Sequence, residues 1–278
     1  FWPMKSRRKL LLGCLMAAVV VLLLLALDNR LVVRRYTVES DKLTERVRLA
    51  VVSDLHSCAY GEGQKELLDA VAAEEPDLVL LPGDIVDDVL PEDNAWTVLK
   101  TLAERWPCCY VTGNHEWWSG EAERICQEIE ALGIHVLRGE SVSIAVKGQT
   151  ITVFGIDDPD SGEDQFSKVS GAGREGYTIL LAHRPEKIDD YLSGPFDLIV
   201  SGHAHGGQWR LPGLINGLYA PNQGLFPQYA GGRYDFGAQV FLVSRGLARE
   251  STRIPRLFNP PELVIADLVP VGASGAAN

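Results

Sequence analysis

Two histidines that follow a single apolar run could hold a metal ion. Residues 198–205 read LIVSGHAH, so His203 and His205 stand two positions apart, just after a glycine. In an extended chain, residues two apart point to the same side, and both imidazoles can therefore enter one pocket. Imidazole is the commonest metal-ligating side chain, which makes a metal site the first interpretation. A pair of surface histidines is the alternative, and the rest of the chain must decide between the two.

Four further apolar runs end in side chains that can bind metal ions. These runs lead into Asp54 and His56, into Asp84 and Asp87, into Asn114, His115 and Glu116, and into His183. In open α/β sheets, ligands bind outside the carboxyl ends of the strands, so the five strand ends predict one shared site. Of the six histidines, only His135 lies elsewhere, and we interpret it as a structural or surface residue.

The types of these side chains limit the choice of metal. Aspartate, asparagine and neutral histidine form a mixed oxygen and nitrogen set, which suits Mn²⁺, Fe or Zn²⁺ and disfavours copper(I). The set is too large for one structural zinc ion, which takes four ligands. It suits two divalent ions about 3.5–4 Å apart, the spacing used in phosphoryl transfer. Glycines at 83, 113 and 202 would let the backbone turn sharply beside the ions.

The elements that must position these residues alternate along the chain. Strand-like runs at 47–52, 78–81 and 108–111 alternate with helical patterns at 64–73, 95–104 and 121–132, which is typical of an α/β domain. A hairpin is expected at 141–146 and 150–154. Further strands are expected near 177–181, 197–200, 239–243 and 263–268. Residues 211–237 are rich in glycine, proline and aromatic residues and predict a long loop beside the site.

Composition excludes some classes of partner. The 278 residues are 46% hydrophobic and 23% charged, which is ordinary for a folded protein. Residues 41–278 hold 19 basic side chains against 35 acidic ones, and such an acidic body argues against nucleic-acid binding. None of the five cysteines has CxxC spacing, so buried thiols are expected, with Cys58 near the site but not a ligand.

An uncharged N-terminal stretch predicts a membrane anchor. As a helix, residues 10–27 would span about 27 Å, enough for a bilayer core. The basic residues of 1–9 place the N-terminus in the cytoplasm, although three arginines beyond the stretch weaken this inference. No clear cleavage site follows, which favours an anchor over a cleaved signal. Residues 6–11 allow either a twin-arginine export motif or ordinary basic flanking.

We expect a linker at 28–46 with one strand, a domain at 47–270 and a disordered tail at 271–278.

Taken together, the motifs carry a family resemblance. They are Asp54-x-His56, Gly83-Asp84-x-x-Asp87, Gly113-Asn114-His115-Glu116, His183 and Gly202-His203-x-His205. In this order, over roughly residues 47–206, they resemble the calcineurin-like metallophosphoesterase superfamily. The resemblance implies a four-layer α/β/β/α sandwich of two mixed sheets. Residues 206–262 are similar to a subgroup of membrane-anchored or exported bacterial phosphoesterases, some of which cleave UDP-2,3-diacylglucosamine, an intermediate of lipid A biosynthesis.

The resemblance also implies roles for individual residues. One ion would be held by Asp54, His56 and His205, the other by Asn114, His183 and His203, and Asp84 would bridge both. His115 would sit over the substrate phosphate and protonate the leaving oxygen, as the catalytic partner of Asp84. Asp87 would support a ligand, and Glu116 would orient the loop. Candidates for substrate contact are Gln208, Trp209, Asn222 and Phe226.

We therefore expect a metal-dependent phosphoric ester hydrolase that contains two divalent ions, Mn²⁺ or else Fe or Zn²⁺. It would hydrolyse a phosphodiester or pyrophosphate by attack of a hydroxide held between the metals. It would be anchored by a single helix in the bacterial cytoplasmic membrane, with the catalytic domain outside. A phosphomonoesterase or protein phosphatase of the same chemistry, and a non-catalytic scaffold with this fold, are the alternatives. We assume a monomer without a nucleic-acid partner.

Overall fold

Two six-stranded mixed β-sheets form the centre of the molecule. The computed structural model describes residues 4–171, 176–249 and 254–273. The first sheet has the order β1-β14-β2-β3-β4-β5, and its strands are β1 (Val32–Ser40), β14 (Glu262–Pro270), β2 (Val47–Val51), β3 (Leu78–Pro82), β4 (Cys108–Val111) and β5 (His135–Val136). Strands β2 to β5 run parallel, and β14 lies antiparallel to β2. Three parallel strands of this sheet therefore end at one edge.

The second sheet also consists mainly of parallel strands. Its order is β12-β13-β9-β8-β7-β6, and its strands are β12 (Gly232–Phe236), β13 (Gln239–Val243), β9 (Leu198–Ser201), β8 (Tyr177–Ala182), β7 (Gln149–Ile156) and β6 (Glu140–Val146). Strands β13, β9, β8 and β7 are parallel, whereas β6 and β7 form the expected hairpin.

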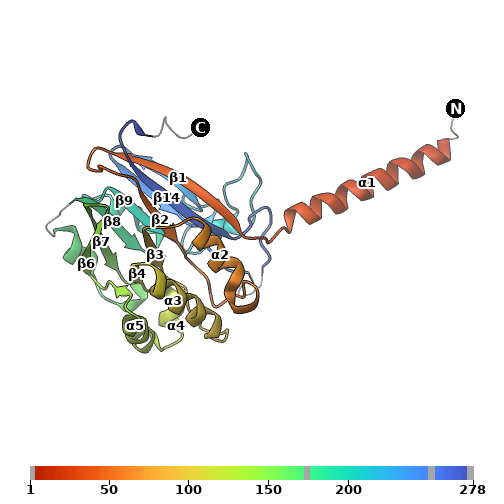
Figure 1. The fold of residues 1–278 in the computed structure, drawn as a ribbon. Helices are drawn as coiled ribbons and strands as arrows, with labels where there is room; N and C mark the ends of the chain where they lie inside the picture. The colour runs from red at the N-terminus through yellow and green to blue at the C-terminus, as the bar shows by residue number, and fades with distance from the viewer. Residues whose placement is uncertain (1–3, 172–175, 250–253, 274–278) are drawn as a thin grey trace.

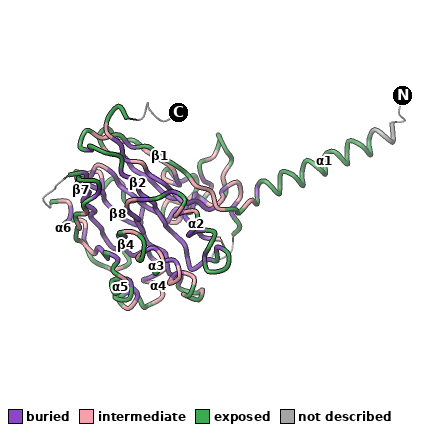
Figure 2. Tube along the Cα trace, viewed as in Figure 1, coloured by how far each residue is buried: buried purple, intermediate pink, exposed green. Residues whose placement is uncertain are grey.

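Three hydrophobic clusters show how the layers stack. Alternate residues of a strand face opposite sides of its sheet. In β2, Leu49 packs between the two sheets, whereas Ala50 packs under α2 (Lys65–Ala73), α3 (Asp93–Arg105) and α5 (Ala122–Ala131). In β8, Ile179 faces the other sheet, and Leu180 packs under α6 (Phe166–Ser170) and α7 (Ile188–Tyr191). The predicted four-layer α/β/β/α sandwich is confirmed, with the buried strands between helices that are only partly exposed (Figures 1 and 2).

The structure refines two expectations about connecting segments. The segment 28–46, expected as a linker with one strand, contributes that strand as β1, which pairs in parallel with β14 along its whole length and so belongs to the first sheet. The segment 211–237, expected to be a loop, contains β10 (Tyr219–Ala220), β11 (Gly224–Leu225) and β12. Strand β12 forms because β13 offers it an antiparallel partner at the edge of the second sheet.

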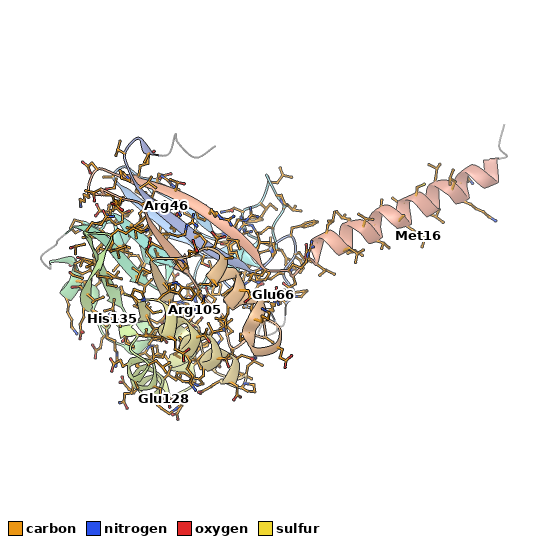
Figure 3. The ribbon with its side chains drawn as sticks, viewed as in Figure 1. Met16, Arg46, Glu66, Arg105, Glu128 and His135 are labelled. Atoms are coloured by element: carbon orange, nitrogen blue, oxygen red, sulfur yellow. The ribbon has the colours of Figure 1, made fainter. Side chains whose placement is uncertain are left out.

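One long helix, α1 (Met4–Ala26), leaves the body of the molecule (Figure 1). Residues 8–26 are long and apolar enough to cross a membrane, and almost none of this stretch is buried. Met16 is exposed on this helix, well away from the body in which Arg46, Glu66, Arg105, Glu128 and His135 lie (Figure 3). Residues 274–278 of the predicted C-terminal tail lie outside the described residues.

Candidate metal centre

The ends of five parallel strands bring the seven predicted ligands together. They follow β2 (Asp54 and His56), β3 (Asp84), β4 (Asn114), β8 (His183) and β9 (His203 and His205). Strands β2 to β4 belong to the first sheet and β8 and β9 to the second, so the site lies where both sheets end at a common edge. All seven side chains are buried.

Asp84 lies at the middle of this group. Its Oδ2 is 3.6 Å from His56 Nε2 and 3.1 Å from His183 Nε2. His183 Nε2 is in turn 3.2 Å from Asn114 Oδ1 and 3.2 Å from His203 Nδ1. Three groups among the described residues could hold an ion. Two of them contain Asp84: one adds Asp54, His56 and His205, the other His183 and His203. The third consists of His56, Asp87 and His115.

Hydrogen bonds on the outer side of three histidines fix which ring nitrogen faces inward. His56 Nδ1 lies 2.9 Å from Asp87 Oδ1, and His183 Nδ1 lies 2.7 Å from the carbonyl oxygen of Pro82. His203 Nε2 lies 3.0 Å from Asn222 Oδ1, which also accepts a hydrogen bond from an arginine. Because each outer nitrogen donates to an oxygen, the inner nitrogen of each neutral ring presents a lone pair to the site, as in ligating histidines.

Two inward-facing atoms have no hydrogen-bond partner. They are His56 Nε2 and Asp84 Oδ2, both fully buried. The other oxygen of Asp84 accepts the backbone N–H of His115 at 2.8 Å, so only Oδ2 is left free. Buried polar atoms without partners are costly, and lone pairs that face one another repel. A bound cation would satisfy both atoms, so these residues fit a metal site.

The backbone at the site is strained. Five of the seven candidate ligands have a positive φ, namely Asp54, His56, Asp84, His203 and His205, with values between 47° and 64°. Left-handed backbone is unfavourable for residues with a side chain and persists where the surrounding structure enforces it, which is common at functional sites. Here the strain is concentrated at the strand ends, where each chain must turn its side chain toward the common centre.

Gly83 allows two of these turns to approach closely. It has φ +86°, and a Cβ at this position would lie 2.5 Å from the backbone nitrogen of Gly113 and 2.8 Å from His183 Nδ1. Any larger residue would therefore push apart the loops that carry Asp84, Asn114 and His183.

Glu116 holds two of the site loops together. Its Oε1 accepts the backbone N–H groups of Ile85 and Val86 at 2.8 and 3.0 Å, and its Oε2 accepts those of Asp84 and Gly113 at 3.0 and 2.8 Å. Burial and the charge of Asp84 raise the pKa of this carboxyl, whereas the donors of Val86 and Gly113 oppose the rise. Four donors from two loops thus converge on one buried carboxylate.

His115 lies at the mouth of the site rather than inside it. Its side chain is 22% exposed, and its Nδ1 lies 2.6 Å from Asp88 Oδ1 and 3.4 Å from Asp87 Oδ1. Burial lowers its pKa, but the hydrogen bonds with Asp87 and Asp88 and the charge of Asp84 outweigh this and raise the pKa to about 9. In the absence of bound cations, the imidazole is therefore protonated at neutral pH, and its Nε2 is not engaged by either aspartate.

Burial and nearby charges shift the pKa values of three candidate histidine ligands in different directions. Burial, together with the charges of His183 and Arg184, lowers the pKa of His203 to about 3. Burial also lowers the pKa of His205. For His183, burial is outweighed by Asp84, and the pKa rises to about 10. Asp84 therefore favours a positive charge at this position, which a bound cation would also supply.

A cavity of about 240 Å³ opens over the centre and is lined by His115, Trp118, Gln208, Pro221 and Asn222 together with five of the candidate ligands. Of the four residues expected to contact substrate, Gln208 and Asn222 line the cavity, whereas Trp209 and Phe226 lie outside it. Trp209 instead donates its indole N–H to the carbonyl of Pro255 at 3.0 Å, and Phe226 is 64% exposed.

Sequence reasoning missed a buried ion pair behind the cavity. Arg184 donates from Nε and Nη2 to the two carboxylate oxygens of Asp158 at 2.5 and 2.9 Å. Its Nη1 donates to Asn222 Oδ1 at 2.8 Å and so fixes the oxygen that receives the N–H of His203. The only sequence signal for this residue is its position directly after His183.

The comparisons with known proteins agree with this geometry. A family model described as calcineurin-like phosphoesterase matches residues 47–207. The chain belongs to this family, and it is a phosphoester hydrolase of the metallophosphoesterase class. The predicted family and the predicted enzyme class are thereby confirmed.

Individual relatives cover most of the chain. It is 29% identical to an uncharacterized metallophosphoesterase of Aquifex aeolicus over 85% of this chain and 91% of that protein. It is 31% identical to the phosphodiesterase YaeI of Escherichia coli over 80% of this chain and 82% of that protein. A transmembrane protein with a metallophosphoesterase domain from Danio rerio is 29% identical over 60% of this chain and 43% of its own length.

Proposed function

We propose that this protein is a membrane-anchored phosphodiesterase that uses two divalent metal ions, of which Mn²⁺ best suits the mixed oxygen and nitrogen ligands. One ion would be held by Asp54, His56, His205 and Asp84, and the other by Asn114, His183 and His203 together with Asp84. The observation that carries the proposal is the set of inward lone pairs, because outer hydrogen bonds orient three histidines toward one unpartnered carboxylate oxygen.

When bound, two such ions lower the pKa of a water molecule and neutralise the charge on a phosphate. The side chains of the protein supply the proton for the leaving group and bind the ester. His115, at the cavity mouth, donates a proton from Nε2 to the leaving oxygen, while Asp87 and Asp88 hold its Nδ1. Asn222 and Gln208 line the cavity and bind the non-reacting part of the ester.

A phosphodiester is the favoured substrate class. The E. coli relative carries the name phosphodiesterase, which supports a diester for this chain as well. The similarity of residues 206–262 to phosphoesterases that cleave UDP-2,3-diacylglucosamine adds pyrophosphates of this kind as test substrates. In phosphodiesters and in pyrophosphates alike, a phosphorus atom lies between two ester or anhydride oxygens. This arrangement suits a site with one general acid and two ions.

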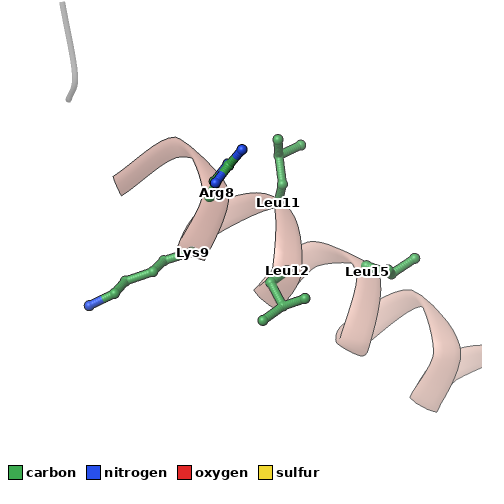
Figure 4. Close-up of a pocket in the computed structure, with 5 residues that line it drawn as sticks. All are labelled: Arg8, Lys9, Leu11, Leu12 and Leu15. Carbon is green, nitrogen blue, oxygen red and sulfur yellow. The ribbon is translucent and has the colours of Figure 1, made fainter. Parts of the chain in front are cut away.

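Helix α1 supports the membrane anchor. Leu11, Leu12 and Leu15 project from the helix, next to Arg8 and Lys9 near its start (Figure 4). Apolar side chains on all sides suit a helix surrounded by lipid, and basic residues at its N-terminal end suit a cytoplasmic start. The body would then lie on the outer side of a bacterial cytoplasmic membrane.

The test is hydrolysis by the full chain in detergent micelles, purified without chelator. We expect hydrolysis of bis-p-nitrophenyl phosphate that depends on Mn²⁺ and is abolished by EDTA, with slower hydrolysis of p-nitrophenyl phosphate. Faster hydrolysis of the monoester would favour a phosphomonoesterase. Bound metal without turnover of either compound or of UDP-2,3-diacylglucosamine would contradict the phosphodiesterase proposal.

A matched pair of histidine variants tests the general acid. His115→Ala should lower turnover by about 10²–10⁴-fold while metal content stays unchanged. His135→Ala is the control, because His135 is exposed in β5 and belongs to none of the groups of described residues that could hold an ion. Loss of metal from His115→Ala would assign this residue to the ligands instead.

A further inference from the structure

The exposed apolar side chains of the body gather in one loop. Outside residues 1–27, ten large apolar side chains are exposed among the described residues, and six of them lie between positions 209 and 226. These six define the apolar loop face: Trp209, Leu211, Leu214, Tyr219, Leu225 and Phe226. A cluster of this kind on an otherwise acidic protein marks an interaction surface.

This loop is attached to the base of α1. The backbone N–H of Phe258 donates to the carbonyl oxygen of Ala26, near the end of the helix, at 2.7 Å. The neighbouring Leu257 pairs with the loop, because Arg210 donates its backbone N–H to the carbonyl of Leu257 at 2.9 Å. The loop, drawn in cyan in Figure 1, lies at the end of the body from which α1 leaves.

Two further features place this face close to a bilayer. Only residues 27–31 separate α1 from β1, and five residues span at most about 18 Å. An apolar cavity of about 190 Å³ also lies under the loop, lined by Trp209, Leu211, Ile215 and their neighbours up to Phe258. An anchored body with so short a connection holds this loop and its cavity at the lipid surface.

The same loop lines the catalytic cavity. Gln208, Pro221 and Asn222 border the polar cavity, and Trp209, the residue after Gln208, lines the apolar one. Any movement of the loop into lipid therefore brings the mouth of the polar cavity to the membrane surface.

From these contacts we propose that the apolar loop face inserts into the outer leaflet beside α1 and presents the catalytic cavity to phosphate esters that carry acyl chains. The proposal rests on the membrane anchoring proposed above. The occupant is the acyl region of the bilayer, because the face is continuous with the helix that enters it. The apolar cavity then takes part of one acyl chain, while the phosphate reaches the polar cavity.

Site-directed fluorophores test the insertion directly. Single cysteines at Leu214, Leu225, Leu15 and Val89, in a Cys14→Ala background, are labelled with an environment-sensitive dye. The full chain is placed singly in nanodiscs of phosphatidylcholine and phosphatidylglycerol, with nitroxide-labelled phosphatidylcholine as the quencher. Leu214 and Val89 are matched, since they are 85% and 81% exposed, and Leu15 reports on α1 itself.

We expect quenching at Leu15, Leu214 and Leu225 but not at Val89. Quenching at Leu15 alone would overturn the loop insertion and leave the anchor intact. No quenching at Leu15 would overturn the anchor and the insertion together. A third outcome is a label at Leu214 that the nitroxide does not quench but that becomes shielded from water in detergent at high protein concentration. That result would assign the face to a second copy of the chain and overturn the proposal.

Kinetic measurements on two substrates distinguish a loss of loop insertion from damage to the catalytic site. The double variant Leu214→Ser and Leu225→Ser should raise KM for a long-chain alkyl p-nitrophenyl phosphate in nanodiscs by roughly tenfold, because two leucines no longer enter lipid. KM for soluble bis-p-nitrophenyl phosphate should not change. Val89→Ser is the control and should leave both unchanged. Equal changes on both substrates would contradict the role of the loop in presenting acyl-chain substrates.

Discussion

Replacing Glu116 by glutamine should destabilise the protein and loosen the site loops. The carboxylate accepts four backbone N–H groups, two at each oxygen. A glutamine keeps one acceptor oxygen and turns the other into an NH₂ group, which leaves two buried donors without a partner. Each such donor costs about 1–3 kcal/mol, so the free energy of unfolding should fall by about 2–6 kcal/mol. That is a large share of the 5–15 kcal/mol typical of a domain.

Urea unfolding of the full chain in detergent, followed by tryptophan fluorescence, measures this change. EDTA is present throughout, because metal bound to the folded state would add its own stabilisation. Glu104→Gln on α3 is the control: Glu104 is exposed, and its replacement should stay within about 0.5 kcal/mol of the wild type. A Glu116→Gln variant as stable as this control would refute the reasoning.

Two further predictions concern the same site. Gly83→Ala should lower both metal content and turnover, because its Cβ would meet backbone 2.5 Å away; Gly171→Ala, with nothing within 4 Å, is the control for metal analysis and kinetics. Wild-type metal content in Gly83→Ala would show that the loops can move apart freely. In the metal-free protein, NMR titration should give His115 a pKa of about 9, and Asp88→Asn should lower it. Because the folded pKa is raised, the stabilisation from protonated His115 is complete below about pH 6.5 and is lost as the pH rises through 9. An unchanged pKa in Asp88→Asn would assign the shift to the other aspartates.

The site could be anticipated from sequence because its chemistry is local to strand ends. Four of the five apolar runs are buried on both faces, and in the first run only Arg48 is partly exposed; the end of each run fixes where the polar side chains of the site begin. The two-residue spacing of His203 and His205 likewise lies within one short segment. The structure brings these residues together because parallel strands deliver their ends to one edge.

Other features depend on contacts that no short segment contains. β1 pairs with β14, so Val32 lies opposite Glu262, and the choice of a partner so distant in sequence is a tertiary event. Arg184 reaches Asp158 and Asn222, which belong to two separate loops. Trp209 follows Gln208 directly, yet the backbone of Gln208, with a positive φ, turns the two side chains toward different cavities.

The most direct test of the central claim is the metal content of the full chain. The protein in detergent is loaded with Mn²⁺, desalted and analysed by inductively coupled plasma mass spectrometry alongside its hydrolysis of bis-p-nitrophenyl phosphate. We predict about two ions per chain, with a loss of both metal and turnover in Asp84→Asn, because Asp84 belongs to both groups of candidate ligands. Full turnover with a single ion per chain, or unchanged metal content in Asp84→Asn, would contradict the binuclear site.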